Sequence, residues 1–244
     1  AVTGTNMGPR SPNTVYSYLH RVTGEYLSQT GMTQVIGGMG ALGSVLAEVA
    51  TKQGATLRLD SPVASITKTD DCVSGVTLVS GEAISAKLII SSADPRTTFR
   101  DLLGYQQMEV GMARRVEHYR SRSGTAKLHL ALSALPQFAG LTDRQLSERL
   151  VITPSMDGME RALNPMKYNE ISAQHTFDIS IPSVADASLA PTDRHVLTAI
   201  VHYVPYAPDM GWEAARPLLL TQLLAELEAY APGIGSLVTA SELV

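Results

Sequence analysis

The alternation of apolar and polar residues between residues 34 and 103 predicts a compact run of helix and strands. A glycine-rich turn leads into an apolar helix over 41–53. Residues 55–60 and 62–66 then alternate with the period of a half-buried strand. The short apolar run 88–90 ends in small residues, which is typical of a buried central strand. The other segments of the chain are expected to be attached to this unit.

A second region follows with a different pattern. Residues 106–122 predict a basic helix, and 124–132 alternate as a strand. Residues 176–181 and 195–203 predict two further strands, the second nearly all apolar and therefore central in its sheet. A leucine stripe at helical spacing predicts a long helix over 212–230. Together these elements predict a mixed sheet with helices on one face.

Composition and charge exclude several classes of function. The 244 residues are 44% hydrophobic and 17% charged, with a net charge of −4, so there is no electrostatic case for nucleic-acid binding. No apolar run is long enough for a membrane span. The single cysteine, Cys72, cannot form an internal disulfide and fits a reducing compartment. We therefore expect a soluble protein of the cytoplasm, with an organelle matrix left open.

One glycine motif matches a nucleotide-binding pattern. Gly38, Gly40 and Gly43 spell G-x-G-x-x-G, and Asp60 follows at the distance of a ribose-binding acid. An NAD(P)-binding Rossmann domain is therefore one alternative. The preceding residues 31–36 contain only two consecutive strand formers, and a strand pattern continues beyond Asp60. This context favours a structural glycine turn that lets the following helix pack on a sheet.

Several short motifs occur in an order that resembles a known family. They are Gly37-Gly38-Met39-Gly40-Ala41-Leu42, Gly54-Ala55, Val63-Ala64-Ser65-Ile66, Gly75-Val76, Gly81-Glu82 and Ser91-Ser92-Ala93-Asp94-Pro95. This order resembles the phytoene desaturase-like flavoproteins, and within them the pyridine nucleotide-disulphide oxidoreductase domain proteins. The likeness extends over nearly the whole chain.

The resemblance implies a fold class and a place within a longer protein. It implies a mixture of α/β and α+β structure: part of an FAD-binding lobe of the glutathione reductase/amine oxidase type, plus a substrate domain with a mixed sheet and helices. Residues 1–33 are expected to be a helical segment of the substrate domain, 34–104 part of the FAD-binding domain, and 105–244 the substrate-binding domain. The phosphate-binding G-x-G-x-x-G and a second flavin segment are expected to lie outside this chain, which would be a middle fragment.

The resemblance also implies three cofactor contacts. Val63 matches a strand residue that meets the adenine of FAD through its main chain, where an N–H donor and a C=O acceptor lie side by side. An ordinary core valine is an equally supported interpretation. Ser92 and Ala93 match a turn that passes beneath the cofactor, although small residues also make common turns at strand ends.

Candidate substrate contacts rest on residue type alone. Tyr16, Tyr18, His20, Tyr203 and Tyr206 each have an apolar body and a polar tip that can line a pocket. Structural packing is the favoured interpretation for the first three. No catalytic side chain is identified from the sequence.

No metal site is expected, because His195 and His202 lie an odd number of residues apart on one strand and point to opposite faces. The leading hypothesis is an FAD-dependent oxidoreductase that transfers a hydride from an apolar small-molecule substrate to flavin. In flavin chemistry the cofactor accepts the hydride, so a conspicuous catalytic residue is not required. The fragment alone is expected to bind FAD weakly or not at all and to be inactive. A non-catalytic binding or scaffold module without flavin is the alternative from another class.

Overall fold

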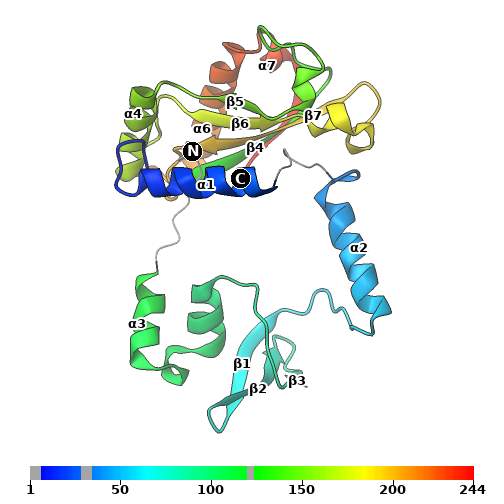
Figure 1. Cartoon of the computed structure of the whole chain (residues 1–244), viewed down its shortest axis with the longest axis vertical. Coiled ribbons are helices and arrows are strands. Elements are labelled where there is room, and N and C mark those ends of the chain that lie inside the picture. Colours follow the sequence, from blue (N-terminus) through cyan, green and yellow to red (C-terminus); the bar gives the residue numbers. More distant parts are fainter. Residues whose placement is uncertain (1–6, 29–34, 120–123) are drawn as a thin grey trace. The chain divides into compact units, whose positions relative to one another are not determined.

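A computed structural model describes residues 7–28, 35–119 and 124–244. The chain divides into two compact units (Figure 1). Unit 1 comprises residues 1–45 and 122–244, and unit 2 comprises residues 46–121. The domain bounds expected from the sequence, 1–33, 34–104 and 105–244, stay a prediction. They differ from the bounds of the compact units, which divide the chain after residues 45 and 121.

Unit 1 is built on a five-stranded sheet in the order β5-β6-β7-β4-β8. Its strands are β4 (Thr125–Leu132), β5 (Leu150–Ile152), β6 (Thr176–Ser180), β7 (His195–His202) and β8 (Val238–Leu243). The central position expected for β7 is confirmed. Every neighbouring pair is antiparallel, so the mixed strand orientation expected from the sequence is wrong.

One face of this sheet carries the core. Leu128, Leu130 and Leu132 of β4 share a face, because successive side chains of a strand alternate between faces. They form one buried cluster with Leu219, Leu223 and Leu227 of the long helix α6 (Trp212–Glu228). Figure 1 shows α6 and α7 (Ile234–Leu237) on this side of the sheet. The leucine stripe therefore covers the apolar face, as its spacing predicts.

The opposite face of the sheet is more polar and more exposed. Ile200 of the central strand is 41% exposed, and Val151 of β5 is 54% exposed. Nδ1 of His129 shares a hydrogen bond with the hydroxyl of Thr198 on the neighbouring strand, at 3.1 Å. Asp178, on the same face, forms a bidentate ion pair with Arg149. The sheet thus has one covered and one accessible surface.

Shorter elements complete unit 1. They are α1 (Thr14–Ser28), η3 (Gln145–Ser147), α4 (Met156–Lys167), α5 (Pro182–Ala185) and η4 (Ala187–Leu189). The segment before α1 docks on α4, where Arg10 pairs with Asp157 at 2.5 Å and donates its backbone N–H to Glu160. α1 continues through Gly24 without a break.

Unit 2 contains a small antiparallel sheet of β1 (Val63–Thr69), β2 (Cys72–Leu78) and β3 (Ala83–Ser85). Asp70 and Asp71 form the turn between β1 and β2, with φ values of 50° and 62°, which a tight turn between twisted strands requires. Three helical segments follow: the π-helix η1 (Thr97–Leu103), η2 (Tyr105–Gln107) and α3 (Val110–His118). The basic helix expected over 106–122 is therefore shorter, and its last residues lie partly outside the described chain.

The helix α2 (Gly38–Lys52) begins in unit 1 and ends in unit 2. Gly54 terminates it with φ +91°, and Ala55 donates its N–H back to Ala50, which closes the last turn. The predicted helix is confirmed, although it starts at Gly38 instead of residue 41.

Two strands predicted in this unit are absent. Residues 55–60 and 88–90 form no strand, and Leu88 and Ile90 are 75% and 88% exposed. The sequence pattern predicted a buried strand, but no described segment lies alongside to pair with it. Within the described ranges, no helix is both long and apolar enough to span a membrane.

Candidate functional site

Val63 lies at the free edge of the three-stranded sheet of unit 2. β1 is an edge strand, and the C=O of the preceding Pro62 accepts the N–H of Val79 at 2.9 Å. Because main-chain groups of consecutive strand residues alternate between the two edges, the N–H and C=O of Val63 point away from β2. Its side chain is 37% exposed. Val63 thus presents an adjacent donor and acceptor to the outside of the sheet.

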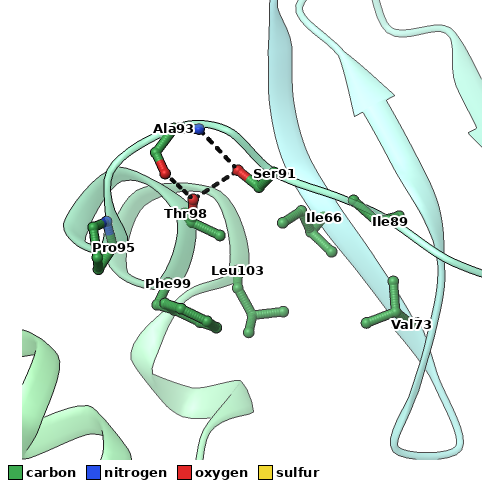
Figure 2. A pocket seen from close by; sticks show the side chains of 9 residues that line it. All are labelled: Ile66, Val73, Ile89, Ser91, Ala93, Pro95, Thr98, Phe99 and Leu103. Carbon is green, nitrogen blue, oxygen red and sulfur yellow. Dashed lines mark hydrogen bonds between the residues drawn. The ribbon is translucent and has the colours of Figure 1, made fainter. Parts of the chain in front are cut away.

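A pocket of about 380 Å³ lies next to this sheet (Figure 2). It is lined by Ile66, Val73, Ile89, Ser91, Ala93, Pro95, Thr98, Phe99 and Leu103. Figure 2 shows the aliphatic side chains on one wall and the turn at residues 91–95 above η1 on the other. The pocket is therefore apolar, with hydroxyl groups at one side.

The turn at residues 91–95 is held by local hydrogen bonds. Ser91 and Thr98 share a hydroxyl–hydroxyl bond of 2.7 Å, and Thr98 also donates to the carbonyl of Ala93 at 3.2 Å. The carboxylate of Asp94 accepts from the backbone N–H groups of Arg96 and Thr97. The hydroxyl of Thr97 and these N–H groups hold the pKa of Asp94 below its usual range. The turn is thereby fixed as the start of η1.

Of the three residues expected to contact the cofactor, only one lines the pocket. Ala93 lines the pocket, whereas Ser92 is exposed and Val63 lies on the neighbouring strand edge. Sequence reasoning missed Ser91 and Thr98 as the residues that hold the turn. Their spacing carries no motif that could have identified them. The roles of Val63, Ser92 and Ala93 remain predictions.

The residue just before the G-x-G-x-x-G motif is bound by another part of the chain. Gly37 and Gly38 have φ values of +80° and +79°, and the N–H of Gly37 donates to Asp186 at 2.6 Å. Asp186 also accepts from the hydroxyl and N–H of Ser188. These bonds, that of the Ser188 hydroxyl foremost, lower the pKa of Asp186. A carboxylate therefore lies next to the start of α2, the end of a helix at which a dinucleotide fold would hold its diphosphate.

Other features of this turn also differ from a dinucleotide fingerprint. The described residues just before it, 35–37, form no strand, and the sheets of both units are antiparallel. Gly40 and Gly43 lie within α2, and a Cβ on either would meet no atom within 4 Å. Asp60 lies in an exposed bend with φ 51°. The close helix–strand packing that the third fingerprint glycine allows is not present at Gly43, which argues against the NAD(P) alternative.

The substrate candidates on α1 do not line either described pocket. Tyr16 and Tyr18 are 70% and 49% exposed, and His20 is also exposed. The rings of Tyr16 and His20 lie 6.3 Å apart, one helical turn along the same face. These side chains form an accessible aromatic strip and no enclosed site.

The two candidates after β7 occupy different environments. Tyr203 is 1% exposed with φ 67°, and its hydroxyl has no hydrogen-bond partner among the described residues. Burial raises the pKa of Tyr203 to about 12, and the charge of Glu160 adds to this effect. Tyr206 is 62% exposed and lines a pocket of about 270 Å³ with Trp212 and Arg216. The five candidates thus do not converge on one site.

The histidines have protein partners. His195 shares a hydrogen bond with the Ser183 hydroxyl at 3.1 Å, and His175 contacts Glu226 at 2.8 Å. Among the described residues, no three side chains of His, Cys, Asp or Glu gather into a group that could hold a metal ion.

Comparison with known proteins places this geometry in context. Residues 11–133 match the family described as "Flavin containing amine oxidoreductase". The chain is 29% identical to "Pyridine nucleotide-disulfide oxidoreductase domain-containing protein 2" of Rattus norvegicus, over 96% of the chain and 42% of that protein. It is 25% identical to a neurosporene-forming phytoene desaturase of Cereibacter sphaeroides, over 84% of the chain and 39% of that protein.

A solved structure shows a similar fold. An oxidoreductase from Methanosarcina mazei superposes with a TM-score of 0.60 at 14% identity, over 85% of this chain and 42% of that one. The chain therefore spans less than half the length of the relatives it matches. Since the family match covers half of the sequence and the relatives align along most of it, the chain belongs to the flavin-containing amine oxidoreductase family.

Proposed function

We propose that this chain is one part of an FAD-dependent oxidoreductase that transfers a hydride from an apolar small molecule to flavin. Unit 2 would hold the adenine end of FAD, and unit 1 would bind the substrate. The family match and the names of the relatives support the cofactor and the type of reaction. FAD, when bound, supplies the hydride acceptor, so the chain's own residues need only bind and orient.

The observation that carries this proposal is the position of Val63 on the edge strand β1, with its main-chain groups directed away from β2. An adenine edge offers a donor beside an acceptor, which is complementary to the outward N–H and C=O of Val63. Since the contact uses main-chain atoms, it constrains the backbone at this position more than the side chain. The turn at 91–95 lies across the same pocket from β1 and brings small side chains close to it.

Unit 1 has the surface that a substrate would need. Its sheet is closed on one face by α6 and accessible on the other, where Ile200 and Val151 are exposed. Sheets with one covered face commonly present the other to solvent or ligand. We assign the substrate to unit 1 on this basis.

The chain by itself is expected to bind FAD weakly or not at all. A diphosphate is normally held by the N–H groups at a helix start. In this chain Asp186 already binds the N–H of Gly37, directly before α2, so a second negative charge at this helix start is disfavoured. The missing anion site would come from polypeptide outside these residues, so binding should be tested in a longer protein.

The test uses a chimera in which these residues replace the matching segment of the Rattus norvegicus relative. We expect the purified chimera to show visible flavin absorption and to gain thermal stability from added FAD. Val63→Pro removes the outward N–H without breaking a bond to β2, whereas Val63→Ala keeps it. Leaving the adenine acceptor unpaired costs about 1–3 kcal/mol, so we expect the proline variant to bind FAD about tenfold more weakly than the alanine variant.

Three results would each contradict a part of the proposal. A folded chimera without flavin absorption or FAD stabilisation would favour the alternative of a scaffold module. Equal FAD affinities for Val63→Pro and Val63→Ala would remove Val63 from the adenine site. Tight binding of FAD by the 244 residues alone would show that the diphosphate site lies within them.

A further inference from the structure

We propose that the accessible face of the five-stranded sheet binds a hydroxyl group of the substrate at one row of polar side chains. This row, which we call the polar row, consists of Ser180, Thr198, His129 and Glu242. The proposal rests on the proposed function, in which unit 1 binds an apolar substrate. It adds the class of that substrate, which is an alcohol: a largely apolar molecule that carries one hydroxyl group.

The register of the sheet brings the four residues together. Ser180 of β6 lies opposite Thr198 of β7, and Thr198 lies opposite His129 of β4. His129 in turn lies opposite Glu242 of β8. Residues directly opposite on neighbouring strands have their side chains on the same face. The sequence neighbours of His129 and Thr198 all belong to the buried cluster under α6, so the polar row lies on the accessible face.

Apolar side chains lie next to the polar row. The adjacent row in one direction along β7, β4 and β8 is entirely apolar and consists of Val196, Ala131 and Ala240. In the other direction Ile200, which is 41% exposed, lies between Asp178 and Lys127. The solvent-facing side of an antiparallel sheet is ordinarily polar. Apolar surface with a few placed polar groups is instead typical of a small-molecule site.

The polar row has hydrogen-bonding capacity that the protein does not use. Nδ1 of His129 bonds to the Thr198 hydroxyl at 3.1 Å, which orients the imidazole ring. No second hydrogen bond of His129 occurs among the described residues, so its Nε2 is available to a ligand. The side chain of Ser180 likewise has no partner within the described ranges. Because these three side chains are half-buried, a ligand that covers them must supply hydrogen bonds.

The chemistry of the polar row selects the group that it binds. An imidazole nitrogen and the hydroxyls of serine and threonine can each donate or accept, and a ligand hydroxyl has the same double capacity. An ammonium group only donates and would depend on the carboxylate of Glu242, which is exposed and therefore contributes little as an ion-pair partner. A hydrocarbon would cover the imidazole and the hydroxyls without pairing them, and a site built to bind a hydroxyl rejects such a molecule. We therefore assign the polar row to a hydroxyl group.

The test compares three ligands of similar shape, which are benzyl alcohol, benzylamine and toluene. Each is titrated into the isotope-labelled 244-residue chain, and NMR follows the imidazole of His129 and the amides of β4 and β7. We expect benzyl alcohol to shift the His129 signals saturably and to bind about fivefold more tightly than toluene, because it gains a hydrogen bond. Benzylamine should bind more weakly than the alcohol.

Thr198→Val removes the hydroxyl that orients His129 and keeps the shape of the side chain. We expect the preference for benzyl alcohol over toluene to fall to less than about twofold in this variant, with the affinity for toluene retained. Thr239→Val is the matched control, since Thr239 is on β8 but outside the polar row, and it should keep the preference. Amide exchange of β4 and β7 reports whether each variant is folded. If Thr198→Val loses this protection, His129→Gln takes its place with the same expected loss.

Each outcome decides the proposal. A preference for the alcohol that Thr198→Val removes and Thr239→Val retains supports it. Equal affinities for benzyl alcohol and toluene overturn it, as does the absence of a saturable shift at His129 or a preference that Thr198→Val leaves intact. Tightest binding of benzylamine would assign the polar row to an amine and also overturns it.

The result is separable from the test of the flavin proposal. A preference for the alcohol in this chain, together with a chimera that binds no FAD, would reject the flavin proposal and leave the polar row as a binding site. FAD binding by the chimera without a preference for the alcohol would reject the polar row alone.

Discussion

Replacing Leu223 by alanine tests whether α6 is the element that stabilises unit 1. Leu223 is 0% exposed and belongs to the buried cluster between α6 and the sheet. Removing a fully buried leucine side chain costs about 2–5 kcal/mol, because both the transfer of its methyl groups and the remaining cavity contribute. Leu218→Ala is a matched control on the same helix, since Leu218 is 58% exposed. Its cost should stay within about 0.5 kcal/mol.

Urea denaturation followed by tryptophan fluorescence measures the difference. The sequence contains one tryptophan, and Trp212 begins α6, so the signal reports on this helix. With a slope of about 2 kcal/mol per molar urea, a loss of about 3 kcal/mol lowers the midpoint by about 1.5 M. Leu218→Ala should leave the midpoint nearly unchanged. Equal midpoints for the two variants would refute the assignment of the core to this face of the sheet.

Three further predictions concern single groups. Because the pKa of Asp186 is lowered in the folded protein, its contribution is present above the unfolded pKa and is lost as the pH falls through the folded value. Amide exchange at Gly37 should therefore accelerate below about pH 4, and Asp186→Asn should abolish this pH dependence. Tyr203→Phe should leave the free energy of unfolding unchanged or slightly raised, since the buried hydroxyl has no hydrogen-bond partner among the described residues. Because the pKa of Tyr203 is raised to about 12, this side chain contributes little tyrosinate at pH 11, and the tyrosinate absorbance of the two proteins should be nearly equal there. In Gly75→Ala the new Cβ would lie 2.3 Å from the carbonyl oxygen of Ile84, so circular dichroism and amide exchange should show loss of the β2–β3 pairing.

β4, β6, β7 and α6 of unit 1 were predictable because their signals are local, whereas the sequence analysis did not predict β5 or β8. The leucines of β4 and α6 recur with the periods of a strand and a helix, and both periods are visible in one sequence. Strand orientation has no such local signal, since it depends on which distant segments pair. Nothing within β4 or β7 shows that the two are antiparallel, so the expected mixed sheet was wrong.

Unit 2 shows where local pattern stops being sufficient. Residues 55–60 and 88–90 carry the composition of strands, but a strand exists only when its main chain has a partner. The outward main chain of Val63 depends likewise on the pairing of Pro62 with Val79. The family resemblance indicated the position of Val63, but its edge geometry required the structure. The hydroxyl bond between Ser91 and Thr98 had no sequence signal at all.

The place of β8 in the sheet has a consequence for synthesis on the ribosome. Leu128 of β4 pairs with Leu243 of β8. The pairing of β4 with β8 can therefore form only after Leu243 has been synthesised. Chains fold from the N-terminus as they emerge, and distant pairings form late. One edge of β4 must therefore stay open to other strands until β8 has been synthesised, and β8, which carries the charged Glu242, then covers it.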